Sequence, residues 1–530
     1  MDELEQAWKK VLFNQFHDIL PGSSIPEVYK DANPLWKQAE TFAEQVLDRA
    51  LRAIAQQIPF PSENSFTSNH HPFVVFNSLS WERSEVVAIA IPYAPDPEQT
   101  WTIRDSDGNI QSTQIVTEQC PHDASVQHSD HLIFLATHVP GVGYRSFSLE
   151  QVPLSNQPSK VDLNPIPASA TNLWELENEY FRVVINPNTG AIDQLYDRAS
   201  QTPVFSADGN QLQFFRDAGQ YWDAWNIAPD YADQRLSDAA LVSMDWIENG
   251  PVQQRLRVTH SFGQSIIQQD YVLQTQSPLL RVESIVDWHE DYTLLKVAFP
   301  VNFNATTATY DMPCGAIERS PTPTTPEERA KWEVPALNWA DLSTEETDNS
   351  AYGVSILSDY KHGYDATDAH LRLTLLKSPK WPDPNADRGR HYFAYGIYPH
   401  TGSWRAAKTT QLGYAFNQPL IAMPLKDTAE PSEATLSPIG QFLNLPQENL
   451  FLMSLKQAED NPNAWSVRFY EGHGEATTLA LDHLFPVMNA SGLGLTPHCI
   501  TTVLEEPMAS IDNEMVQAIA PWKIVTVAFQ

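Results

Sequence analysis

The sequence predicts a mainly β protein, with several sandwich domains following a short N-terminal α-helical segment. Helical periodicity is confined to residues 1–58, and short runs of β-branched and aromatic residues, separated by turn residues, fill the rest of the chain. The 40 prolines of the 530 residues suit long loops between sandwich strands. We therefore expect a helical unit at 1–58 and β units at 72–150, 172–415 and 416–530.

The helical segment contains two predicted helices. The first covers residues 2–16, and Pro21-Gly22 after it is the turn that stops the helix. At a period of 3.6 residues, one face of this helix carries mainly apolar side chains: Leu4, Trp8, Val11 or Leu12, and Gln15 or Phe16. Because two amphipathic helices alone bury little surface, we expect this segment to belong to a larger bundle or to dock on the β part.

The second helix should begin near Ser24, which fits an N-cap with Glu27 completing a capping box. Pro26 is tolerable in the first turn, whereas Pro34 should kink or split the helix because proline lacks an N–H and clashes with the preceding turn.

The β part follows a loop-like stretch at 59–71 and is interrupted at 151–171 by a Pro/Ser/Asn-rich stretch that suits a linker. The clearest strand candidates are runs of β-branched and aromatic residues, at 73–76, 85–91, 132–135, 144–149, 180–185, 255–260, 270–273, 280–288 and 294–299.

Composition excludes several classes of protein. The formal net charge of −33 repels phosphate backbones and anionic lipid heads, so neither a nucleic-acid nor a membrane partner is expected. No apolar run is long enough for a transmembrane helix, and the first residues lack a secretory signal pattern. Cys120, Cys314 and Cys499 suit neither a disulfide framework nor a Cys-x-x-Cys metal site. A reducing, cytoplasmic setting is therefore expected.

Two His-Asp patterns are candidate metal ligands. His17-Asp18 follows the first helix, where such a pair is more often a capping or surface arrangement than a metal site. His128-Ser129-Asp130 has a spacing that would let two ligands reach one metal, but it reads as a polar loop tip.

Two loops combine charged residues with aromatic or turn residues. The stretch 216–225 interleaves Asp217 and Asp223 with Trp222 and Trp225, which could hydrogen-bond sugar hydroxyls and stack on sugar faces. On composition, the favoured alternative is that its tryptophans are buried and only hold the loop in place. The second loop, 382–389, is a charged turn that contains Asp387 and Arg388.

The segment Gln15-Phe16-His17-Asp18-Ile19-Leu20-Pro21-Gly22-Ser23-Ser24 closely resembles the α-mannosidases of glycoside hydrolase family 38. Further resemblances to that family occur in order along the chain, at 74–81, 176–183, 190–192, 359–364, 375–379, 398–400, 468–471 and 525–527.

This resemblance implies an N-terminal α/β barrel, a small helical bundle and β-sandwiches, of which the large one is galactose-mutarotase-like. It also implies a zinc held by two His and two Asp, with one Asp acting as nucleophile and a further Asp as acid/base. A retaining glycosidase needs two such carboxylates, and zinc on the sugar hydroxyls can help orient the substrate. We expect the barrel, and with it the nucleophile and the acid/base residue, to lie outside this chain.

Residue by residue, the resemblance assigns His17 as the last zinc ligand and Asp18 as a sugar contact. It suggests substrate contacts from Asp223 and Trp225 in the first loop and from Asp387 and Arg388 in the second. No catalytic residue is assigned to this chain. Since zinc normally takes at least three protein ligands, zinc is expected only once the barrel completes the site.

The favoured hypothesis is thus one part of a retaining, zinc-assisted enzyme that hydrolyses terminal α-mannosides and is inactive without the barrel. Its partners would be an α-mannoside or oligosaccharide, a separate chain carrying the barrel, and further copies of itself if it oligomerises. The alternative is a non-catalytic carbohydrate-binding or scaffold protein. The two differ at Trp8, which should lie in an exposed apolar patch in the first case and under polar residues in the second.

Overall fold

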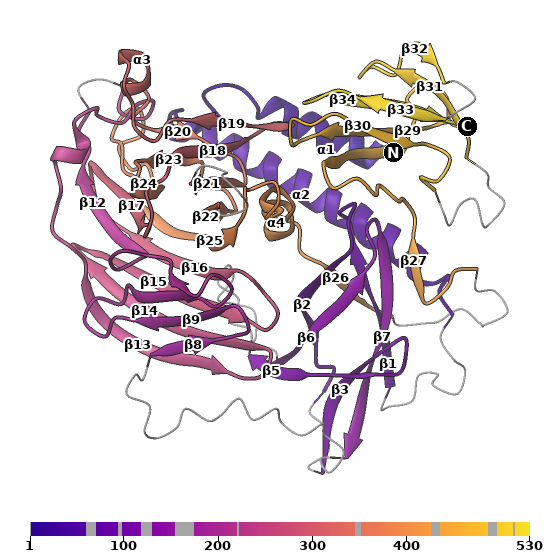
Figure 1. Ribbon diagram of the computed structural model, residues 1–530, viewed down its shortest axis with the longest axis horizontal. Helices are drawn as coiled ribbons and strands as arrows, with labels where there is room; N and C mark the ends of the chain where they lie inside the picture. Colours follow the sequence, from indigo (N-terminus) through magenta and orange to yellow (C-terminus); the bar gives the residue numbers. More distant parts are fainter. Residues whose placement is uncertain are drawn as a thin grey trace.

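The structure is a computed structural model that describes residues 2–59, 70–93, 98–117, 130–153, 174–219, 222–344, 351–425, 435–485, 495–511 and 515–530. The protein is mainly β with an N-terminal helical segment, as predicted. In Figure 1 the small sandwich is violet, the large one magenta to orange and the C-terminal sheets yellow, and the two indigo helices cross behind them. None of the helices in the described ranges has both the length and the apolar character needed to cross a bilayer.

The helical segment is a hairpin of α1 (Asp2–Phe13) and α2 (Pro26–Ala55). Small buried side chains, Ala7 and Ala32 among them, let the two helices approach closely. Pro34 does not split the second helix, because α2 continues through it, and a kink at this proline stays a prediction. One missing hydrogen bond does not break a helix of 30 residues whose other turns remain intact.

The predicted cap at Ser24 is wrong. The N-cap of α2 is Ile25, whose side chain makes no capping hydrogen bond. The Ser24 hydroxyl instead donates to the Asp18 carbonyl at 2.8 Å, and the Ser24 N–H donates to the Tyr29 hydroxyl at 3.1 Å. The Ser24 side chain therefore closes the α1–α2 turn.

The small sandwich packs two antiparallel sheets around a core that includes Phe73, Phe134 and Phe147. One sheet has the order β26-β1-β7-β3-β4, with β27 also on β7: β26 (Ile421–Pro424), β1 (His70–Asn77), β7 (Gly143–Pro153), β3 (Gln99–Asp105), β4 (Ile110–Gln111) and β27 (Ile439–Gln441). The other is β2 (Arg83–Ala90), β6 (Asp130–Val139) and β5 (Thr113–Thr117).

The large sandwich has one continuous core, to which three antiparallel sheets contribute. The largest sheet runs β13 (Ala240–Asn249), β14 (Gln253–Phe262), β15 (Ser265–Gln274), β16 (Leu280–Trp288), β25 (Gly389–Thr401), β22 (Tyr352–Ser358), β21 (Trp339–Ser343), β18 (Thr307–Met312) and β19 (Gly315–Arg319). The second runs β12 (Gln211–Arg216), β17 (Thr293–Pro300), β24 (His370–Lys377), β23 (Gly363–Ala366) and β20 (Val334–Pro335). The third runs β11 (Thr202–Pro203), β10 (Ile192–Asp197), β9 (Phe181–Ile185) and β8 (Glu175–Glu177). Short helices η3 (Tyr231–Asp233), α3 (Pro326–Arg329) and α4 (Thr409–Asn417) lie between strands.

The C-terminal region has its own core, formed by residues such as Phe469, Leu484 and Phe529. Its main sheet runs β28 (Leu450–Gln457), β29 (Trp465–Glu471), β34 (Ile524–Phe529), β31 (Pro497–Thr501) and β32 (Pro507–Ser510), beside the pair β30 (Thr477–Ala480) and β33 (Val516–Ile519).

The strand runs expected from the sequence fall within strands of the structure to within one residue. Of the linker expected at 151–171, the first three residues complete β7, and 154–171 lie outside the described residues. The division into four units stays a prediction, and the pairing of β26 with β1 means that its last unit shares a sheet with its second. Cys314 and Cys499 are free thiols, while Cys120 lies outside the described residues.

Candidate functional site

The turn between α1 and α2 exposes the first His-Asp pair. The Asp18 carbonyl accepts hydrogen bonds from the Ser24 hydroxyl at 2.8 Å and the Tyr29 hydroxyl at 3.2 Å, which fixes the backbone. The Asp18 carboxylate lies 3.5 Å from Nε2 of His17 and 3.3 Å from the Ser23 hydroxyl. With 79% of its side chain exposed, His17 is available to a partner.

Close to His17 in the sequence, α1 and the turn after it carry a group of large apolar side chains, which we call the α1 face and define by Leu4, Trp8, Leu12, Phe13, Phe16 and Leu20. All six side chains are exposed, and Trp8 is 62% exposed. The Phe16 ring is centred 4.4 Å from the His17 imidazole, so this surface reaches the His-Asp pair. The buried Ala7 and Asn14 of this segment show that a different side of α1 packs against α2.

A second group of predicted residues meets in loops at the ends of strands of the large sandwich. Buried Asp223 accepts the backbone N–H of Lys380 at 2.7 Å and that of Trp381 at 3.2 Å, and so ties the loop after β12 to the loop after β24. Lys377 adds a second tie, because its ammonium lies 2.8 Å from the carboxylate of buried Asp217 and also donates to the Asp223 carbonyl.

Three tryptophans lie on these tied loops, and we call them the tryptophan platform: Trp222, Trp225 and Trp381. Their ring centroids are 4.4 Å (222–381), 5.3 Å (225–381) and 5.9 Å (222–225) apart. Although the rings touch, they remain 60%, 46% and 47% exposed in chain order. The alternative reading of this loop, in which the tryptophans are buried and merely fix it, is therefore wrong for Trp222 and Trp225.

Charged groups border the platform. Asp291 pairs with both Lys380 at 2.9 Å and Arg388 at 2.6 Å, and hydrogen bonds from these two cations hold the pKa of the Asp291 carboxyl below its ordinary value. Asp387 has a φ of 60°, in the left-handed region, and its carbonyl oxygen is 2.7 Å from Nε2 of His391. Burial raises the pKa of the Asp387 carboxyl, against opposing effects of nearby His391 and Lys361.

The structure thus brings Asp223, Trp225, Asp387 and Arg388 into one loop group, and it places His17 and Asp18 on the helical hairpin. No hydrogen bond or ring contact between described residues joins the two places. Sequence reasoning did not select Trp381, Lys377 or Asp291 as site residues, because only the fold brings the end of β24 and the loop after it close to the loops that carry Asp223 and Asp291. The one local signal was a tryptophan beside a proline in a charged turn, at Trp381-Pro382.

The second His-Asp pattern lies largely outside the described residues, which include only Asp130 of its three members. Asp130 accepts a hydrogen bond from the Thr117 hydroxyl at 2.9 Å. Gln220 and Tyr221, next to the platform, also lie outside the described residues.

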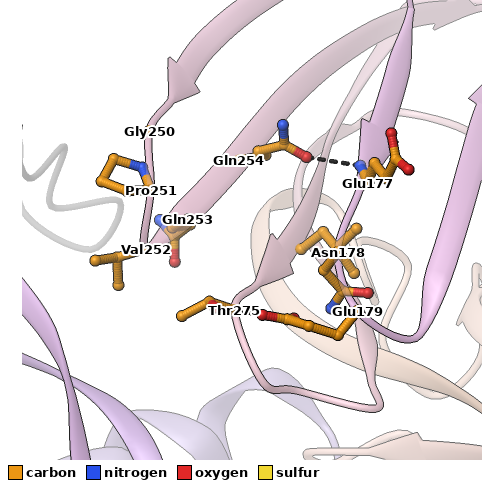
Figure 2. A pocket seen from close by; sticks show the side chains of 10 residues that line it. Glu177, Asn178, Glu179, Gly250, Pro251, Val252, Gln253, Gln254 and Thr275 are labelled. Carbon is orange, nitrogen blue, oxygen red and sulfur yellow. Dashed lines mark hydrogen bonds between the residues drawn. The ribbon is translucent and has the colours of Figure 1, made fainter. Parts of the chain in front are cut away.

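A shallow polar hollow lies elsewhere, near the start of β9 (Figure 2). Its polar groups satisfy one another: Gln254 accepts the N–H of Glu177 at 2.7 Å, and Glu179 accepts from the Thr275 hydroxyl at 3.0 Å. None of the predicted site residues lines it, so we treat it as structural.

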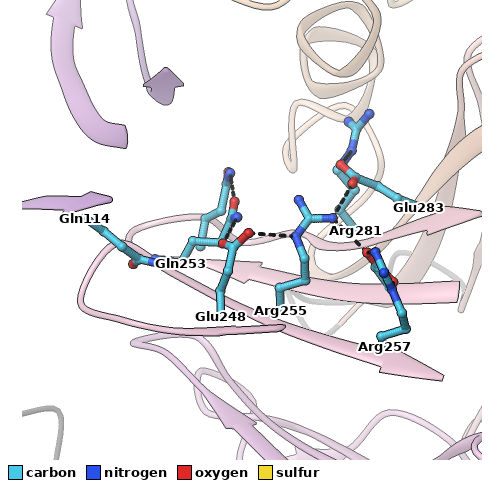
Figure 3. A network of polar contacts seen from close by, with 9 residues as sticks. Gln114, Glu248, Gln253, Arg255, Arg257, Arg281 and Glu283 are labelled. Carbon is cyan, nitrogen blue, oxygen red and sulfur yellow. Dashed lines mark hydrogen bonds and ion pairs between the residues drawn. The ribbon is translucent and has the colours of Figure 1, made fainter. Parts of the chain in front are cut away.

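Near this hollow, a polar network on the largest sheet joins the two sandwiches (Figure 3). Its centre is Arg255, which reaches Glu283 at 2.6 Å and Asp270 at 3.1 Å. Gln114 of β5 accepts the backbone N–H groups of Val252 and Gln253 at 3.2 and 2.9 Å, so the small sandwich is fixed to the large one here.

Three family models match the chain: "Alpha mannosidase middle domain" at 1–54, "Glycosyl hydrolases family 38 C-terminal domain" at 176–385 and "Glycosyl hydrolases family 38 C-terminal beta sandwich domain" at 449–527. Together they match more than half of its residues. The chain belongs to glycoside hydrolase family 38. The resemblance noted in the sequence is confirmed.

Curated alpha-mannosidases align with most of this chain. Human alpha-mannosidase 2C1 is 29% identical over 99% of the chain, and alpha-mannosidase G of Dictyostelium discoideum is 28% identical over 90%. The chain covers only 45% and 43% of these two proteins, less than half of each. An alpha-mannosidase structure from Enterococcus faecalis V583 superposes with a TM-score of 0.76 at 18% identity, covering all of this chain and 63% of that one, which shows a shared fold.

Proposed function

We propose that this family-38 chain forms one part of an α-mannosidase, which hydrolyses terminal α-mannosides with retention once a catalytic α/β barrel is combined with it. The observation that carries this proposal is the exposed α1 face beside His17. An apolar surface of this kind is typical of an interaction site rather than of ordinary protein surface.

The two hypotheses drawn from the sequence differ at this surface. A chain adapted to act alone as a carbohydrate-binding or scaffold protein should cover Trp8 with polar residues, whereas Trp8 and Leu12 are exposed. This favours a chain whose hairpin docks against a further domain. The net charge of −33 continues to disfavour a nucleic acid as that partner.

In this proposal, zinc is bound jointly by this chain and the barrel. No cluster of three or more His, Cys, Asp or Glu side chains suited to a metal occurs among the described residues. His17 and Asp18 supply too few donors, since a zinc site normally takes at least three protein ligands. This chain therefore does not fit a zinc site alone, and we propose that exposed His17 contributes one ligand to a site completed by the barrel.

Chain residues other than His17 would act on the substrate. The Asp18 carboxylate, held at the turn, is placed to accept a hydrogen bond from a sugar hydroxyl. The loop residues Asp223, Trp225, Asp387 and Arg388 would contact the substrate from the β side. No nucleophile or acid/base residue is assigned to this chain, and a cytoplasmic setting remains part of the proposal, supported by the free thiols.

The test compares this chain alone with the same chain joined to, or mixed with, the catalytic barrel of a family-38 α-mannosidase. We expect no hydrolysis of an aryl α-mannoside by the chain alone and turnover in the combined protein. His17→Ala should reduce that turnover at least about 100-fold, in line with the loss of a metal-site group.

The matched control is His483→Ala, because His483 is equally exposed and lies 3.3 Å from the neighbouring Asp482. This variant should keep turnover within about twofold. Hydrolysis by the chain alone that disappears in His17→Ala would show that the site is complete without the barrel, contrary to the proposal.

A further inference from the structure

We propose that the tryptophan platform is a stacking surface for one sugar residue of an α-linked mannose oligosaccharide, and that this chain binds such a glycan without any other domain. The inference deepens the proposed function and rests on it for the choice of sugar. It concerns binding through Trp222, Trp225 and Trp381, not the hydrolysed bond.

The first support is the shape and chemistry of the platform. Trp222 and Trp381 meet edge to face at 77°, and Trp225 is tilted by 40° from Trp381, so the three rings form a faceted apolar surface. A pyranose has the matching chemistry, because its axial C–H groups gather on ring faces while its hydroxyls lie mostly around the edge. Aromatic rings gain from such contacts through their apolar area and their electron-rich faces.

The second support is that the exposure of these rings is built into the fold. Trp222 has a φ of 59°, a left-handed conformation that costs a non-glycine residue about 1–2 kcal/mol. The carboxylate of buried Asp223, the next residue, accepts the backbone N–H groups of both Lys380 and Trp381. Side chains held out in this way are preorganised, so little conformational entropy is lost when a ligand binds.

The third support is the border of hydrogen-bonding groups. Among the described residues, none accepts a hydrogen bond from the indole N–H of a platform tryptophan, so these donors remain for a ligand. Next to the rings, the ion pairs of Asp291 with Lys380 and Arg388 add donors and acceptors at the surface. A protein partner's apolar side chain would leave these groups unused, but sugar hydroxyls can bond them.

The experiment is saturation-transfer NMR on the full chain, with an α-linked mannotriose at millimolar concentration as the probe. We expect transfer to the ring C–H protons of the sugar. Trp222→Ala and Trp381→Ala should each weaken binding about tenfold, and Trp381→Phe should restore most of it because an aromatic face remains.

The control is Trp522→Ala, which removes an exposed tryptophan of the C-terminal region and should leave binding within about twofold. Thermal unfolding of each variant establishes that it is folded. Absence of saturation transfer with the wild-type chain, or an equal loss of mannotriose binding in Trp522→Ala, overturns the proposal that the tryptophan platform binds the sugar. Either result is separable from the proposed function, because hydrolysis by the barrel-completed protein is measured independently of binding by this chain.

Discussion

The loops that present the tryptophan platform depend on one buried ion pair, so its removal should affect stability and binding together. Lys377→Met deletes the ammonium that lies 2.8 Å from Asp217, whose side chain is fully buried. Asp217 would keep the Ala228 N–H, at 2.9 Å, but no opposing charge. The Asp223 carbonyl would also lose its Lys377 donor.

The expected cost follows from that geometry. Breaking a buried pair by removing one partner typically costs about 3–5 kcal/mol, and we expect the lower end, about 3 kcal/mol, because Lys377 retains some exposure. For a domain of about 200 residues this corresponds to a fall in Tm of about 6–12 °C. Because both loops lose a tie, mannotriose binding should weaken as well.

The assay is differential scanning calorimetry, combined with the same saturation-transfer measurement. Lys380→Met is the control, since Lys380 lies three positions away and pairs with exposed Asp291. An exposed pair contributes at most about 1 kcal/mol, so the Tm of this variant should change little. An unchanged Tm in Lys377→Met, or an equal fall in Tm in Lys380→Met, would refute the idea that the buried pair holds the loops.

Three further predictions concern other parts of the chain. Trp8→Glu should lower the binding of a hydrophobic dye, without lowering Tm by more than about 2 °C, because the side chain is exposed and a surface change costs about 0.5 kcal/mol. His400→Gln should lower the free energy of unfolding by about 1–3 kcal/mol in denaturant titration, because it removes the imidazole whose Nε2 lies 2.8 Å from the fully buried carboxylate of Asp341 and leaves that carboxylate the Ser355 hydroxyl. Burial raises the pKa of Asp311 from 3.8 to about 6, so its contribution to stability increases as pH falls through 6. Wild type should therefore gain about 1 kcal/mol over Asp311→Asn between pH 7.5 and pH 5, measured as a difference in free energy of unfolding, and an unchanged difference would contradict this.

The strands were predictable because the signal for a strand is local. The run 294–299 is apolar apart from Lys296, and it forms most of β17, an inner strand of the second sheet of the large sandwich. The N-cap of α2 was not predictable for the opposite reason. Ser24 has the right side chain in the right place, but the Asp18 carbonyl, six residues earlier, takes its hydrogen bond.

The candidate site divides in the same way. The His17 turn and the Trp225 loop could be found because each is a contiguous pattern. Trp381 could not, since its proximity to Trp222 follows from the pairing of strands far apart in sequence. The exposure of Trp8 could not be predicted either. An amphipathic pattern shows that one face of the helix is apolar, but it does not show whether the same chain covers that face.

The pairing of β26 with β1 has a consequence for synthesis on the ribosome. Phe73 lies opposite Pro424, so the first β-strand to emerge waits for most of the chain before it gains this neighbour. Contacts just after α2 depend on the same late segment, because Ile58 shares a buried cluster with Met423 and the Gln57 carbonyl accepts the N–H of Thr435. Contacts of such long sequence separation form slowly. The contacts that hold the C-terminal end of the helical hairpin against the β part therefore form late in translation. A chain cut before β26 would leave the edge of β1 unpaired and able to pair with other molecules.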